Sequence, residues 1–302
     1  MEIRVIARGA LAGFLAGVLG FVFAKIFGEP LIDRAIAFED SHAQVLDKIA
    51  HALGPVPEVH DHHSVEISRD IQSTLGLATG IVGIATAFGA LVAVAYLVLH
   101  GRTAFRPQQL VWLLCGAGFL GVFALPFVKY PANPPAVSND DTIAERSELY
   151  LTLVIASLIL LALAAFLAHR LKPYVGRLWS VVSSGAAFLV AYGVLIAVLP
   201  ALGDLGTNKD AAGTFGIVRS ATETPPPVIN VLDTPLTIDG ITYAPGQIIA
   251  PGFDADVLWS FRWYSLLEQV LIWTVLALVL GALVERYLGT RRRAARQELV
   301  AV

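Results

Sequence analysis

The sequence predicts an all-α membrane protein with six transmembrane helices, formed as a single membrane domain over residues 1–302. Hydrophobic residues make up 56% of the chain and charged residues 15%, whereas a soluble domain has about 25% charged residues. Six apolar segments are each about 20 residues or longer, enough for a helix to cross ~30 Å of hydrocarbon. They cover roughly 5–27, 74–99, 107–128, 149–169, 178–200 and 263–284.

The connections between these segments are sorted by the sign of their charge. If the chain crosses the membrane at every apolar segment, four stretches on one side hold 12 of the 21 basic residues. These are Arg4, Arg8, Arg102, Arg106, Arg170, Lys172, Arg177, Arg286, Arg291, Arg292, Arg293 and Arg296. Because cytoplasmic loops carry the excess of Lys and Arg, both termini are predicted inside and the acidic connections outside.

Three outer connections hold most of the chain outside the spans. The first, 28–73, is acidic and histidine-rich, and its residues 39–53 have the apolar spacing of a short surface helix. The second, 129–148, is proline-rich, which favours an extended and irregular backbone. The third, 201–262, is the longest, and Asp239-Gly240 between two β-prone runs predicts a small hairpin.

Glycines recur at helical spacing in the first three spans, which indicates close helix packing, because lipid supplies no hydrophobic drive for helix pairing. They are Gly9, Gly13, Gly17, Gly76, Gly80, Gly83, Gly116, Gly118 and Gly121. The single cysteine, Cys115, lies within the third span and is expected to be a packing residue. The chain has no Gly-Lys-Ser or Gly-Lys-Thr, so we expect no ATP-binding loop.

The sharpest local motif is the run His60, Asp61, His62 and His63 in the first outer connection. Imidazole is the usual ligand for cobalt, nickel, copper and zinc, and a carboxylate can complete the shell. His42 and His51 could join from the preceding helix. The run has no fixed ligand spacing, so it predicts a labile metal-capture site. The alternative is a solvated polar loop that happens to contain histidine.

Charged residues near the membrane are the second candidate. Lys25 lies near the outer end of the first span, Glu29 follows at i+4, and Glu268 lies about 7.5 Å inside the last span. Ionisable residues at such depth usually face a partner or a wet cavity. They therefore indicate either a polar path or a Lys25–Glu268 or Lys25–Glu29 pair that only locks helices, with snorkelling as a third reading.

Several stretches together resemble the CbtA family of probable cobalt transporter subunits. The most specific are Lys129-Tyr130-Pro131-Ala132-Asn133-Pro134-Pro135, followed by Asp141-Thr142-Ile143 and Arg146, and Gly252-Phe253-Asp254-Ala255-Asp256 before the last span. Further matching stretches are Arg8-Gly9-Ala10-Leu11-Ala12-Gly13, Phe23 to Pro30, and Ser68-Arg69-Asp70-Ile71-Gln72. The third outer connection is longer than the family pattern leads us to expect.

The resemblance implies a bacterial inner (plasma) membrane protein that takes part in cobalt uptake with a small single-span partner of the CbtB type. A homo-oligomer is a further assembly that the sequence allows, and membrane lipid is the surrounding partner. Lys129, Asn133, Asp141 and Arg146 then join Lys25, Glu29 and Glu268 as candidates for a mouth and gate.

We therefore predict a membrane subunit that captures Co(II) outside and passes it inward, with other divalent metals as alternative cargo and no permanent cofactor. The alternative is a non-transporting scaffold or metal-binding accessory protein, which the sparse charge inside the spans favours. No nucleophile–base pair supports an enzyme. Nothing in the charge pattern supports binding of nucleic acid.

Overall fold

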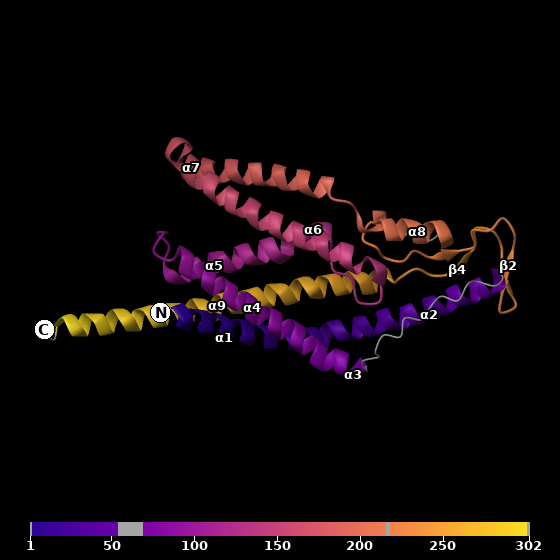
Figure 1. The fold of residues 1–302 in the computed structure, drawn as a ribbon, viewed down its shortest axis with the longest axis horizontal. Helices are drawn as coiled ribbons and strands as arrows, with labels where there is room; N and C mark the ends of the chain where they lie inside the picture. Colours follow the sequence, from indigo (N-terminus) through magenta and orange to yellow (C-terminus); the bar gives the residue numbers. More distant parts are fainter. Residues whose placement is uncertain (1, 54–68, 216–217, 301–302) are drawn as a thin grey trace.

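Long helices dominate the computed structural model, which describes residues 2–53, 69–215 and 218–300 (Figure 1). Within these described ranges, five helical segments are long and apolar enough to cross a membrane, judged by length and composition. They are Glu2–Leu53, Gln72–Leu99, Pro107–Lys129, Asp140–Asp210 and Ala255–Leu288. The architecture is that of an all-α, multi-pass membrane protein. Six membrane crossings, with both termini inside, remain a prediction.

The first apolar segment belongs to a helix that continues far beyond it. Helix α1 (Glu2–Phe23) passes through a π-helical turn, η1 (Ala24–Gly28), into α2 (Glu29–Leu53). The helix expected at 39–53 is confirmed, but it is the end of α2 and not a short helix of its own. Pro30 does not stop the helix, since it is the second residue after η1, where the wider turn gives the proline ring room.

The next two apolar segments also contain π-helical turns. Helix α3 (Arg69–Ile71) leads through η2 (Gln72–Gly76) into α4 (Leu77–Leu99). Helix α5 (Pro107–Gly118) leads through η3 (Phe119–Ala124) into α6 (Leu125–Lys129). Pro126 is the second residue of α6, as Pro30 is of α2. In both places a π-helical turn precedes the proline, which keeps one helix direction through a residue that lacks an N–H.

Helix α7 (Ile143–Val198) contains both the fourth and the fifth predicted segments. Its backbone leaves helical geometry at Gly176, with φ 78° and ψ 172°, a conformation that glycine adopts without steric cost. The helix bends back there into two arms (Figure 1). The connection expected around 170–177 is therefore helical up to this single glycine.

The last helix, α9 (Ala255–Val300), begins before the predicted residue 263. The Asp254 carboxylate accepts hydrogen bonds from the backbone N–H groups of Asp256 (2.8 Å) and Val257 (3.4 Å). This is the chemistry of an N-cap, and it explains why the helix starts at this point. The aromatic residues Trp259 and Trp263 lie within its first turns.

Two of the connections predicted to lie outside form a small cap, which we define as residues 130–142 and 199–254. It contains η4 (Asp140–Thr142), η5 (Leu202–Asp204), α8 (Gly206–Phe215) and the strands β1 (Val228–Ile229), β2 (Leu236–Ile238), β3 (Ile241–Tyr243) and β4 (Ile248–Ala250). Strands β2 and β3 pair antiparallel around Asp239 and Gly240, which both have positive φ, and β1 pairs antiparallel with β4. Helix α2 reaches this cap through Lys48, whose ammonium lies 2.7 Å from the Asp239 carboxylate.

The main core joins α1, α4, α5 and α9, and its closest contact is the crossing of α1 and α4. A methyl group on Gly9 would collide with the carbonyl of Gly89, and one on Gly13 would collide with the carbonyl of Ala85. The packing role predicted for this ladder is confirmed, as is that of the buried Cys115. In α4, however, methyl groups on Gly80 and Gly83 would meet no atom, so these glycines do not serve helix packing.

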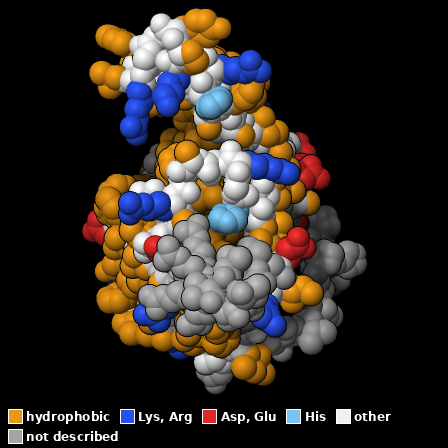
Figure 2. All heavy atoms as spheres, turned by 90° about the vertical axis from the view of Figure 1, so that its left-hand side faces the viewer, with side chains coloured by type: hydrophobic (Ala, Val, Ile, Leu, Met, Phe, Trp, Pro, Cys, Tyr) orange, Lys and Arg blue, Asp and Glu red, His pale blue; other side chains and the backbone are white. Residues whose placement is uncertain are grey.

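The basic segments lie at one end of the molecule. The N-terminus, the connection between α4 and α5, and the bend of α7 all lie at the left of Figure 1, and the cap lies at the right. Figure 2 views this left-hand end and shows Lys and Arg side chains distributed over it among hydrophobic surface. The fold therefore brings the basic segments together at the end opposite the cap.

Candidate functional site

The candidate gate residues fall into two separate groups. The first surrounds the π-helical turns η1 and η2, where the Lys25 ammonium donates to the backbone oxygen (3.0 Å) and the hydroxyl oxygen (3.1 Å) of Ser73. Arg69 binds Glu29 at 2.7 Å and Asp33 at 3.0 Å. The sequence left open a pair between Lys25 and Glu29 or Glu268, and this pairing is wrong. The Lys25 ammonium binds Ser73, and Glu29 is paired with Arg69. These contacts fasten the start of the second apolar segment to the end of the first.

Glu268 belongs to the same region but has no such contact. No hydrogen bond or ion pair involves its carboxylate within the described part of the chain. The side chain lines a cavity of about 350 Å³ between α9, η2 and α4. Gln269, Gly76, Gly80 and Ile84 are among the other lining residues. The open space beside Gly80 is thus the space that Glu268 faces.

The second group lies in the cap, where Asn133 joins three segments. Its amide nitrogen donates to the backbone oxygen of Thr222 (2.6 Å) and to Ser138 (3.0 Å). Its amide oxygen accepts from the guanidinium of Arg262 in α9 at 2.8 Å. Arg262 also donates to the backbone oxygen of Ala132 (3.3 Å). Asn133 therefore ties the proline-rich connection to the last helix.

Glu223 forms the centre of this group, and its side chain is completely buried. One carboxylate oxygen accepts from Thr142 (2.5 Å) and from Asn208 (2.7 Å), and the other lies 3.2 Å from Arg146. The backbone of Glu223 has a φ of 65°, uncommon for a residue with a side chain. We call Asn133, Thr142, Arg146, Asn208, Glu223 and Arg262 the cap network.

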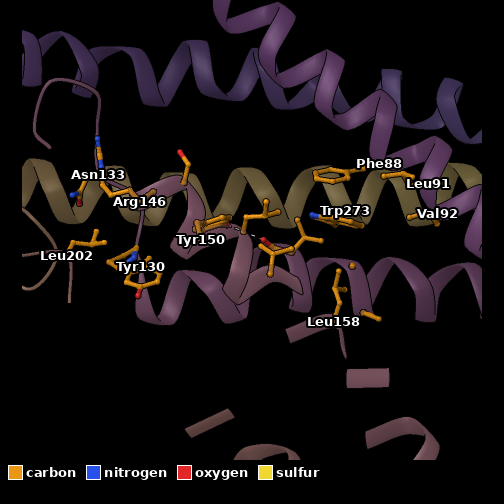
Figure 3. Close-up of a pocket in the computed structure, with 18 of the residues that line it drawn as sticks. Phe88, Leu91, Val92, Tyr130, Asn133, Arg146, Tyr150, Leu158, Leu202 and Trp273 are labelled. Atoms are coloured by element: carbon orange, nitrogen blue, oxygen red, sulfur yellow. Dashed lines mark hydrogen bonds between the residues drawn. The ribbon is translucent and has the colours of Figure 1, made fainter. Parts of the chain in front are cut away.

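A cavity of about 940 Å³ lies beneath the cap network. Figure 3 shows Asn133, Arg146 and Tyr130 at one end of it and Phe88, Val92 and Trp273 at the other. Its walls are apolar over most of their length, and Arg146 is the one charged side chain that lines it in the described part of the protein. A cavity lined by one cation and no carboxylate is unsuited to a free divalent metal ion, because the two positive charges repel each other.

Two further gate candidates make no contact that suggests a gate. The Lys129 ammonium lies 5.9 Å from the centre of the Tyr130 ring, at the edge of a cation–π contact. Asp141 is exposed in η4, where its backbone N–H donates to Asn139 at 3.2 Å. Both residues are near the cap network but outside it.

The predicted metal ligands are only partly described. His60, Asp61, His62 and His63 lie outside the described residues. His42 is half-buried and stacks on Phe38, and burial followed by the charge of Arg219 lowers its pKa below the usual range. His51 is exposed and lies 3.5 Å from Asp47. In the described ranges, no group of three or more His, Cys, Asp or Glu side chains is close enough together to hold one metal ion.

Sequence reasoning missed several residues that hold these regions together. Glu223, Arg69 and Ser73 were assigned no role, although Arg69 belongs to one of the stretches that carry the family resemblance. No local pattern marks Glu223, because its partners Thr142, Arg146 and Asn208 are distant in the chain. Only the assembled cap could reveal it.

The comparison with protein families agrees with the geometry of a multi-pass membrane protein. The family model described as "Probable cobalt transporter subunit (CbtA)" matches residues 2–285. The chain belongs to the CbtA family. This membership supports a role in metal transport and, through the word subunit, an assembly with another chain. Neither a curated protein nor a solved structure matches the chain.

Proposed function

We propose that this CbtA family member is the membrane subunit that admits Co(II), or a related divalent metal ion, from the outer face to the interior. The observation that carries the proposal concerns Glu268, which lies in a candidate span. Its carboxylate has no counter-ion in the described structure and faces a cavity between the helices. Carboxylates within membrane helices are rare and usually lie on ion or substrate pathways. Membership of a family of probable cobalt transporter subunits supports the same cargo.

The proposed route has a capture step and a passage step. His60, Asp61, His62 and His63, with imidazole from α2, would bind the ion outside, since imidazole and carboxylate both ligate Co(II). The ion would then reach the Glu268 cavity past the region of η1 and η2, where Lys25 and Glu29 are fastened to Ser73 and Arg69. The membrane potential can drive this movement. A doubly charged ion gains about 4.6 kcal/mol per 100 mV when it moves toward a negative interior.

The cap network and the apolar cavity would have a supporting role in this scheme. Asn133 and Arg146 are engaged with Arg262, Thr222 and Glu223, so we assign them to holding the cap on the bundle. A bacterial inner membrane location and a single-span partner of the CbtB type complete the proposal.

Uptake by vesicles tests the proposal. Membrane vesicles that contain this chain, alone and with its partner subunit, should accumulate Co(II) when the interior is made negative. Glu268→Gln should reduce the rate at equal protein amount, whereas Glu285→Gln, the same change on an exposed residue of α9, should not. Metal binding without accumulation in either preparation would favour the accessory-protein alternative.

A further inference from the structure

Near its end, α2 presents a carboxylate and an imidazole whose one contact in the described part of the chain is with each other. Asp47 and His51 are one helical turn apart, and the Asp47 carboxylate lies 3.5 Å from Nε2 of His51. Both side chains are largely exposed, at 71% and 81%. Side chains at i and i+4 lie on the same face of a helix, which is the spacing by which helices supply two ligands to one metal ion.

The surroundings of this pair leave it available to a cation. The ammonium of Lys48, the adjacent basic residue, forms an ion pair with the Asp239 carboxylate at 2.7 Å and not with Asp47. His42, the other predicted ligand on α2, is half-buried against Phe38 and feels the charge of Arg219. Among the described histidines of the outer connections, His51 is thus the accessible imidazole, and it is paired with a carboxylate.

We propose that Asp47 and His51 form a two-ligand site for a divalent transition-metal ion, with water completing the coordination. The proposal rests on the proposed function, because this site would be the fixed, helix-borne part of metal capture. Nitrogen and oxygen donors together suit Co(II), Ni(II) and Zn(II). Two protein ligands with several waters make a labile site, which an uptake protein needs in order to release the ion to the next step.

The alternative is an ordinary ion pair between Asp47 and a protonated His51, and metal titration of the full-length protein separates the two. The probe is Co(II) alone at pH 7.5, followed by its visible absorption and by calorimetry. The background is His60→Ala, His62→Ala and His63→Ala, so that the neighbouring histidines do not contribute. Removal of a ligand typically lowers metal affinity at least about tenfold, so Asp47→Asn and His51→Ala should each produce at least this loss.

Two matched controls sharpen the test. Asp233→Asn removes an exposed carboxylate from the cap and should leave Co(II) affinity unchanged. The double change His51→Ala with Ala52→His keeps the composition but moves the imidazole to i+5 from Asp47, off the shared face, and should weaken binding as much as His51→Ala alone.

The outcomes distinguish this inference from the proposed function. Unchanged Co(II) affinity in Asp47→Asn and His51→Ala would overturn the two-ligand site. If vesicles carrying those variants still accumulate Co(II) at the normal rate, the proposed function stands. An absence of uptake by the unmodified protein and its partner would overturn the proposed function, whereas Co(II) binding at Asp47 and His51 would still be measured directly.

Discussion

The two groups of candidate gate residues differ in how completely their charges are matched. In the cap network, the buried carboxylate of Glu223 has Thr142, Asn208 and Arg146 around it. Near η1 and η2, Lys25, Glu29 and Arg69 are also engaged, but Glu268 is left without a partner in the described structure. A matched buried charge holds a fold together, whereas an unmatched one beside a cavity is available to a ligand. We therefore expect the first group to contribute to stability, and the function proposed above places ion passage at Glu268 in the second.

The largest expected effect is on the cap network. Glu223→Ala leaves Arg146 without its buried counter-charge, and loss of one member of a buried pair typically costs about 3–5 kcal/mol. Thermal unfolding of the purified protein in detergent should show this loss as a markedly lower midpoint. Glu145→Ala, which removes an exposed carboxylate from the first turn of α7, is the control. Equal midpoints for both variants would show that the network is not a structural centre.

The next effect concerns the Arg69 contacts. Arg69→Ala strands Glu29, which is only 6% exposed, and an unsatisfied buried polar group typically costs about 1–3 kcal/mol. The unfolding midpoint should fall less than in Glu223→Ala. The double change Arg69→Ala with Glu29→Gln should recover part of the loss, because the stranded charge is gone. A double change as damaging as the sum of the two single changes would argue against the pair.

Glu268 should show the opposite pattern, with transport affected and stability preserved. Glu268→Gln removes a charge that has no partner to lose, so the unfolding midpoint should stay within the error of the measurement. Lys25→Met and Glu268→Gln should have additive effects on stability, because the structure places the Lys25 ammonium on Ser73. A coupling energy above about 0.5 kcal/mol in this double-mutant cycle would restore the helix-locking pair.

The smallest expected effect is a pH dependence from His42. Burial, followed by the charge of Arg219, lowers its pKa in the folded protein, so the unfolded chain binds its proton more readily. The stabilisation by neutral His42 is complete above about pH 6.5, the ordinary histidine value, and is lost as pH falls toward the lowered folded pKa. His42→Phe should keep the stacking on Phe38 and reduce the difference between unfolding midpoints at pH 7.5 and 5.5. An unchanged difference would remove His42 from the explanation.

The sequence by itself determined the features that depend on near neighbours in the chain. Apolar length located the long helices, glycine spacing marked the face of α1 that packs closely but not its partner, and the stretches around Asn133 and Asp254 pointed to the family. It missed that α1 and α2 form one helix, since the π-helical turn that accommodates Pro30 has no signature in residue types.

Tertiary structure alone decided which charges meet. Lys25 has Glu29 one turn away along the chain, yet its ammonium binds Ser73, and Glu29 is taken by Arg69, because the start of the second apolar segment packs against the end of the first. Glu223 acquires its partners only when α7, α8 and the proline-rich connection come together. Periodicity specifies a helix and its apolar face, but an ion pair depends on distances between segments, which are set only when the helices pack.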